Sequence, residues 1–301
     1  MFTNRIMDAG SQTYSKLRLL PEFVDKSLLI KAVFDNANTR ILLVAPRKSG
    51  KSVNLLMLKC FLEVVPSNTI MENNRALFKG LLINEHKEIM ECHQGKYPIL
   101  YLDLKAFCPI SSITNALNQL ALVVQGAYKQ HDYLESSSEL SDYEKTAFKM
   151  WCDLVDIPEP REGLIINSAL INLANYLKKY WQKDVIILCD EYDSMCSNAV
   201  ISIDNIPEGD ALPPGRYYRS AEKEIREIID ICIGALSSIV KSEDVPVFRA
   251  ILTGMSNLKT MGSSKLNNVI AYEFDIHDEF QPFYGLSKVE LDSTSARNEK
   301  N

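Results

Sequence analysis

The sequence has little of what marks disulfide-rich and zinc-binding proteins. Seven cysteines occur among 301 residues, an odd number at wide spacing and without a C-x2-C pair. Neither a disulfide framework nor a zinc ribbon is therefore predicted. The four histidines are scattered and show no metal-ligand spacing. Reduced thiols and no metal cluster are the simplest interpretation.

Long apolar runs and a basic charge are also missing. No apolar run approaches the roughly 20 residues that a membrane span needs, and the first residues lack the apolar segment of a signal peptide. We therefore expect a cytoplasmic or nuclear protein that is neither secreted nor embedded in a membrane. The 33 Lys and Arg against 39 Asp and Glu give a net charge of −6. This balance argues against a broad, sequence-independent nucleic-acid binder.

The chain alternates short apolar runs with longer helical stretches. Continuous apolar runs are typical of strands buried on both faces, as in a parallel sheet covered by helices. We expect five strands, at 41–44, 98–104, 185–189, 247–253 and 271–274, and all but the last are near-continuous apolar runs. Apolar spacing and a capping box at Ser141–Glu144 predict helices at 51–65, 113–129, 141–154, 164–181 and 217–240. The predicted fold class is α/β, a single three-layer domain over residues 1–291 with a flexible loop at about 197–215 and a polar tail at 292–301. The polar, serine-rich segment at 130–138 is also expected to be a surface loop.

The segment after the first expected strand fits a phosphate-binding loop. Its pattern is A-x4-G-K-S, with alanine in place of the usual first glycine. Gly50 lets the backbone curl so that N–H groups point toward an anion, and the next helix presents its free N–H groups. Lys51 would reach the β- and γ-phosphates of a nucleotide, and Ser52 would bind Mg²⁺. The expected nucleotide-binding residues are Ala45, Pro46, Arg47, Lys48, Ser49, Gly50, Lys51, Ser52 and Val53.

A second polar cluster ends the apolar run at 185–189. Asp190 is expected to hold Mg²⁺ beside Ser52, and Glu191 to polarise a water for attack on the γ-phosphate if the chain turns there. Thr253, at the end of the next strand, either contacts the γ-phosphate or the water, or caps its own turn. Glu191, Lys51 and Thr253 are thus the candidate catalytic residues. Asp193 has no assigned task, and we expect a surface or capping role for it.

The strand expected at 98–104 lies between these two motifs. Together with the Asp-Glu pair, it favours the P-loop NTPases that have a catalytic glutamate, a five-stranded, mainly parallel sheet of order 5-1-4-3-2 and helical insertions. Small-molecule kinases fit less well, because they usually place the acidic strand next to the strand that precedes the phosphate loop.

Seven short motifs in the right order make the chain resemble the AAA-ATPase-like family, whose members are often fused to a PD-(D/E)XK-type nuclease domain. The motifs begin at Phe23, Ala45, Leu77, Tyr97, Asp190, Leu252 and Phe283, and the resemblance runs to about Leu291. It implies a nucleoside-triphosphatase core and an element at 25–27 beside the nucleotide. Asp25 is also interpreted as an N-cap of the helix expected at 26–34. The helical lid and nuclease-like part of the family are missing, so no nuclease activity is predicted.

Three functions remain open. The first is an ATPase whose Mg²⁺-dependent hydrolysis drives a conformational change in a protein partner or oligomer, with Arg216 or Arg219 as candidate arginine finger. The second is a non-catalytic nucleotide-binding or interaction module, because a site without a lid excludes water poorly. The third and least favoured is a small-molecule kinase with Asp103 as its base. No guanine-recognition signature is present, so ATP is the expected nucleotide.

Overall fold

The computed structural model describes residues 14–105, 110, 112–153, 162–204, 218–258 and 264–292. In these segments, five parallel strands form one sheet of order β2-β3-β4-β1-β5. Read from the β5 edge, this order is 5-1-4-3-2. The strands are β1 (Arg40–Val44), β2 (Ile99–Asp103), β3 (Val185–Asp190), β4 (Val247–Gly254) and β5 (Ile270–Glu273).

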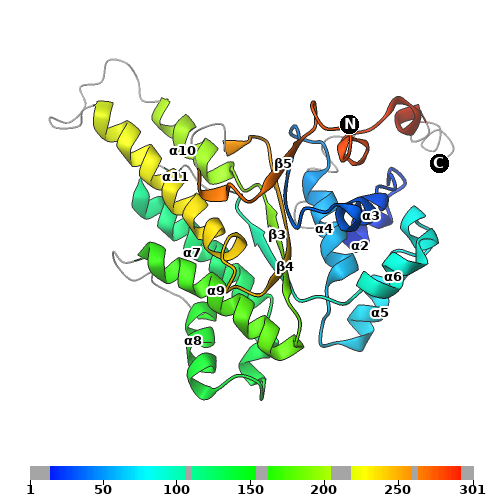
Figure 1. The fold of residues 1–301 in the computed structure, drawn as a ribbon, viewed down its shortest axis with the longest axis horizontal. Coiled ribbons are helices and arrows are strands. Elements are labelled where there is room, and N and C mark those ends of the chain that lie inside the picture. Colours follow the sequence, from blue (N-terminus) through cyan, green and yellow to red (C-terminus); the bar gives the residue numbers. More distant parts are fainter. Residues whose placement is uncertain are drawn as a thin grey trace.

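Helices cover both faces of the sheet, which gives three layers (Figure 1). One face carries α2 (Tyr14–Arg18), α3 (Leu28–Asp35), α4 (Lys51–Leu62), α5 (Asn68–Ala76), α6 (Lys87–His93) and the 3-10 turn η2 (Leu82–Glu85). The other face carries α7 (Ile113–Lys129), α8 (Asp142–Cys152), α9 (Glu162–Trp181), α10 (Ser194–Asp204) and α11 (Tyr218–Val240). The remaining short 3-10 turns are η3 (Asp132–Ser136), η5 (Ser264–Leu266) and η6 (Gln281–Phe283).

Each central strand buries both of its faces. Successive side chains of a strand point to opposite sides, so Ile41 and Leu43 join the core under α4, whereas Leu42 and Val44 join the core under α7, α9 and α11. Strand β3 is buried at every position. This double burial explains why the strands are continuous apolar runs and confirms the α/β class.

Three local expectations need correction. Helix α4 ends at Leu62 rather than at residue 65, because the chain leaves the helix to bond Tyr97, with Val64 N–H donating to its carbonyl at 2.9 Å. The expected surface loop at 130–138 contains η3 and buries His131 and Leu134.

The expected flexible loop at 197–215 is helical in its first part, since α10 continues to Asp204 and buries Ala199. The remainder of that loop and most of the expected tail, residues 293–301, lie outside the described residues. The capping box at Ser141 and Glu144 is confirmed at the start of α8. In the described part of the chain, no helix has both the length and the apolar character to cross a membrane.

Candidate functional site

The polar residues predicted from the sequence gather at the carboxyl ends of three adjacent strands. Strands β1 and β4 are in register with Val44 opposite Gly254, and Ala45 N–H donates to the Gly254 carbonyl at 3.1 Å. Strand β3 lies on the other side of β4. Parallel strands end at the same edge of a sheet, so the loop after β1, Thr253 of β4 and Asp190 of β3 meet there.

The loop between β1 and α4 has an unusual backbone. Gly50 lies in the left-handed region at a φ of 91°, and Lys48 has a φ of 64°. Glycine adopts this conformation without steric cost, whereas lysine does so at some cost. Helix α4 then starts at Lys51, and Asn54 N–H makes its first bond, 2.9 Å to the Gly50 carbonyl. The N–H groups of the first turn have no partner within the helix and are available to an anion.

Side chains of this loop differ in exposure. Pro46, Arg47 and Lys48 are exposed, and the Arg47 guanidinium contacts the Met255 sulfur at 3.1 Å. Ser52 is exposed at the start of α4, and Val53 is half-buried. The hydroxyl of Ser49 is buried and has no hydrogen-bond partner among the described residues.

Lys51 is a buried cation at the beginning of α4. Its side chain donates to the carbonyls of Ala45 at 2.8 Å and Pro46 at 2.7 Å, and the residue is 7% exposed. Burial lowers the pKa of its ammonium, while the negative charges of Asp190 and Glu191 act in the opposite direction. A positive charge is thus held between the loop and the acidic end of β3.

Asp190 is buried and fixed by its neighbours. Its Oδ1 accepts from the Thr253 hydroxyl at 2.6 Å and from Glu191 N–H at 3.1 Å. Thr253 does not cap its own turn; its hydroxyl crosses to the neighbouring strand. The carbonyl of Thr253 in turn accepts from Tyr192 N–H at 2.9 Å. The ends of β3 and β4 are therefore locked together by side-chain and backbone bonds.

Glu191 lies where the chain turns out of β3. Its φ is 49°, in the left-handed region that glutamate rarely adopts. The expected turn is present, and strained non-glycine conformations of this kind concentrate at functional sites. Burial raises the pKa of the Glu191 carboxyl, and the nearby charge of Asp190 raises it further.

Asp193 holds the loop that follows β4. Of the surface or capping role expected for it, the surface role is wrong, because Asp193 is 1% exposed. Its Oδ2 instead caps backbone, accepting from the N–H groups of Met255 at 3.0 Å and Ser256 at 2.7 Å. The Tyr192 hydroxyl donates to the Ser256 carbonyl and accepts from Leu258 N–H. The two residues after Glu191 thus clamp the loop that follows β4. The sequence feature that could have indicated this contact is Gly254, directly after Thr253, because a glycine allows Tyr192 and Asp193 to lie close to the backbone.

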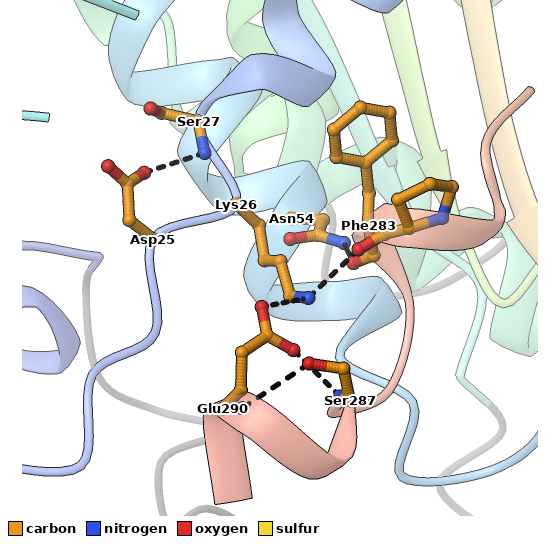
Figure 2. A network of polar contacts seen from close by, with 8 residues as sticks. Asp25, Lys26, Ser27, Asn54, Phe283, Ser287 and Glu290 are labelled. Atoms are coloured by element: carbon orange, nitrogen blue, oxygen red, sulfur yellow. Dashed lines mark hydrogen bonds and ion pairs between the residues drawn. The ribbon is translucent and has the colours of Figure 1, made fainter. Parts of the chain in front are cut away.

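Asp25 uses its carboxylate to join two segments of backbone. One oxygen accepts from Ser27 N–H just ahead of α3, and the other accepts from Leu82 N–H, both at 2.8 Å. Helix α3 begins at Leu28, two residues after the expected start, with Ser27 as its N-cap. The contacts of Asp25 therefore fix the chain beside α4 (Figure 2).

The other candidate catalytic residues lie farther from the phosphate loop or outside the part of the chain that the structure describes. Asp103 ends the edge strand β2 opposite Asp190, and β3 and β4 separate it from β1. Burial raises the pKa of its carboxyl. The structure does not describe Arg216 or the side chain of Arg219. Within the described segments, no group of three or more His, Cys, Asp and Glu side chains could hold a metal ion.

A comparison with family models gives one match. The model described as a predicted AAA-ATPase, AAA-ATPase_like, matches residues 9–262. Neither the curated proteins nor the solved structures include a match to this chain. Since the match covers most of the sequence, the chain belongs to the predicted AAA-ATPase family.

Proposed function

We propose that this member of the predicted AAA-ATPase family binds ATP with Mg²⁺ at the loop between β1 and α4 and hydrolyses it. The observation that carries the proposal is the placement of Lys51. Its buried ammonium lies at the N-terminus of α4, next to the loop that contains the left-handed Gly50. Burial lowers the pKa of this ammonium, and the negative charges of Asp190 and Glu191 act on it in the opposite direction. A cation, free N–H groups and carboxylates at adjacent strand ends form a site suited to a metal-bound polyphosphate.

The loop and α4 account for phosphate binding. The unbonded N–H groups of the first turn and the positive end of the helix favour anions. The Lys51 ammonium, which donates to the carbonyls of Ala45 and Pro46, is placed to donate to phosphate oxygens instead. Because Lys51 is already largely desolvated, the exchange costs little hydration and gains charge-assisted hydrogen bonds.

The residues present fit Mg²⁺. Ser52 and Asp190 offer hard oxygen ligands, and Mg²⁺ in nucleotide sites takes one or two protein groups together with phosphate oxygens and waters. When bound, the ion neutralises charge on the phosphates. Thr253 orients the Asp190 carboxylate toward this task through their 2.6 Å hydrogen bond.

Glu191 is the proposed general base. Its raised pKa makes the carboxylate a better proton acceptor than an ordinary glutamate, because both burial and Asp190 disfavour the charged form. The left-handed turn directs the chain away from the strand at this residue, so Glu191 need not follow the alternation of β3. Residues 1–291 act as one unit in this proposal, and hydrolysis is coupled to a change in a protein partner or oligomer.

A nucleotide titration tests the binding step. Calorimetry with Mg²⁺ and ATP compares wild type with Lys51→Ala. Lys178→Ala on the opposite face serves as control, because that lysine forms an exposed ion pair with Asp184. We expect Lys51→Ala to weaken binding about tenfold or more, the range for hydrogen bonds to charged groups. Equal affinity of the three proteins would refute the proposed site. Lys51-dependent binding without any turnover would refute the proposed hydrolysis and support a non-catalytic nucleotide-binding module instead.

A further inference from the structure

We infer that residues 281–291, here called the strap, position the phosphate loop and set its affinity for nucleotide. This inference rests on the proposed function. The strap follows β5 and lies beyond the residues matched by the family model. It returns to the face of the sheet that carries α3 and α4 and lies beside these helices (Figures 1 and 2).

The strap bonds the loop directly. Gly285 N–H donates to the Ser49 carbonyl at 2.8 Å, one residue before the left-handed Gly50. The side-chain amide of Asn54, the fourth residue of α4, donates to the Phe283 carbonyl at 2.8 Å. Gly285 has a φ of 72°, a conformation that brings its N–H to the loop and that glycine adopts without penalty. These two bonds restrain both the loop backbone and the start of the helix.

The strap is anchored in the core next to these bonds. Tyr284 is 6% exposed and belongs to the same buried cluster as Ala45 and Leu55. The strap is therefore anchored in the same core that contains residues of the loop and of α4. Because interiors are close-packed, a displacement of the strap would disturb the loop backbone as well.

A polar latch closes the strap over the N-terminal segment (Figure 2). The Lys26 ammonium lies 2.7 Å from Glu290 Oε1 and donates to the Pro282 carbonyl at 2.8 Å. The other oxygen of Glu290 accepts from Ser287 N–H at 2.7 Å, and Glu290 N–H donates to the Ser287 hydroxyl. One lysine thus holds both ends of the strap.

The latch residues are partly shielded and fixed at their base. Their side chains are 13% exposed for Lys26 and 27% for Glu290, so water screens the pair less than an exposed ion pair. Asp25, the residue before Lys26, bonds the backbone of Ser27 and Leu82. The lysine therefore projects from a rigid segment, and loss of the ion pair would loosen the strap rather than the lysine.

Nucleotide affinity follows from this chain of contacts. A loosened strap withdraws the donor from the Ser49 carbonyl, and the loop then samples conformations in which its N–H groups no longer converge. Binding must restore the order, which costs affinity. Lys26, Glu290 and Gly285 act as positioning residues, because they act through the loop.

The chain offers a closely matched control. Glu144 sits in a capping box with Ser141 and pairs with Lys179 at 2.7 Å, the distance between Glu290 and Lys26. The arrangement is similar, although one oxygen of Glu144 accepts from both partners whereas Glu290 uses both oxygens. Helix α8 lies on the other face of the sheet. Glu144→Gln and Lys179→Met therefore report the cost of losing such a pair without touching the strap.

The test measures the Kd of Mg²⁺-ATP for wild type, Lys26→Met, Glu290→Gln and the two control variants. We expect the latch variants to bind about three- to tenfold more weakly, within the range by which residues without ligand contact modulate a site, and the controls to match wild type. Faster hydrogen exchange at the Gly285 amide should accompany the weaker binding.

Two failures are distinguishable. If wild type shows no Lys51-dependent affinity for Mg²⁺-ATP, the proposed function fails and the inference falls with it. If wild type binds but the latch variants bind equally well, the inference alone is overturned.

Discussion

The hydroxyl of Thr253 donates to Asp190 Oδ1 across 2.6 Å and so joins the carboxyl ends of β4 and β3. Asp190 is 4% exposed, and Thr253 is 1% exposed. A buried carboxylate needs such donors, because losing a partner leaves its charge poorly compensated. The bond also fixes the direction of the carboxylate beside Glu191 and the phosphate loop.

Replacement of Thr253 by valine keeps the shape of the side chain and removes the donor. We expect Thr253→Val to destabilise the fold by about 1.5–3 kcal/mol, the range for hydrogen bonds to charged groups, and to raise the Mg²⁺ concentration needed for ATP turnover. Urea unfolding and a Mg²⁺ titration measure the two effects. Thr253→Ser is the control because it retains the hydroxyl. If valine and serine behave alike in both assays, Thr253 does not orient Asp190.

Replacement of Glu191 by glutamine separates binding from chemistry. If Glu191 is the general base, Glu191→Gln should lower the ATP turnover rate by about 10²- to 10⁴-fold while the affinity for ATP stays close to that of wild type. Single-turnover hydrolysis and calorimetry provide the two values. Glu243→Gln, an exposed position in the turn before β4, is the matched control. A glutamine variant with normal turnover would exclude Glu191 as the base.

The pH dependence of turnover has a defined sign. A base acts in its deprotonated form, and the pKa of Glu191 is raised by burial, by Asp190 and by Asp103, against opposing effects of Lys105 and Lys51. The rate should therefore fall, as pH decreases, at a midpoint above the ordinary glutamate value of about 4.3. Asp103→Asn removes one of the negative charges and should move that midpoint to lower pH. A pH–rate profile in which the midpoint stays fixed or rises would contradict this assignment.

Gly254 has no room for a side chain. A Cβ at this residue would lie 2.6 Å from the Tyr192 ring and 2.7 Å from Asp193 Oδ1. We expect Gly254→Ala to destabilise the protein by about 1–3 kcal/mol, the cost of overpacking, and to displace the clamp on the loop after β4. Gly126→Ala in α7 is the control, because its Cβ would meet nothing within 4 Å, and helix propensity makes it neutral or stabilising. Similar denaturation midpoints for the two variants would argue against the clamp.

Local sequence signals predicted the elements that depend on local physics. The apolar run at 185–189 becomes the fully buried β3, and the spacing within 113–129 becomes α7 with the same bounds. The capping box at Ser141 was found because its two partners are three residues apart. Helix α4 ended early, by contrast, because its end is set by Tyr97, a residue from a distant part of the chain.

The sequence by itself determined the alternation of buried strands and helices and the loop of residues 45–52. Strands buried on both faces are visible as continuous apolar runs, helices as apolar residues at regular spacing, and the loop as a contiguous motif that contains glycine and lysine. Only the tertiary structure decided the task of Asp193, the bond from Thr253 to Asp190 and the strap that Lys26 holds to Glu290. The partners in these contacts are 62, 63 and 264 residues apart. Such pairs form only when the sheet brings strand ends and loops together. A local pattern of residue types therefore does not indicate which distant residue each of these side chains will contact.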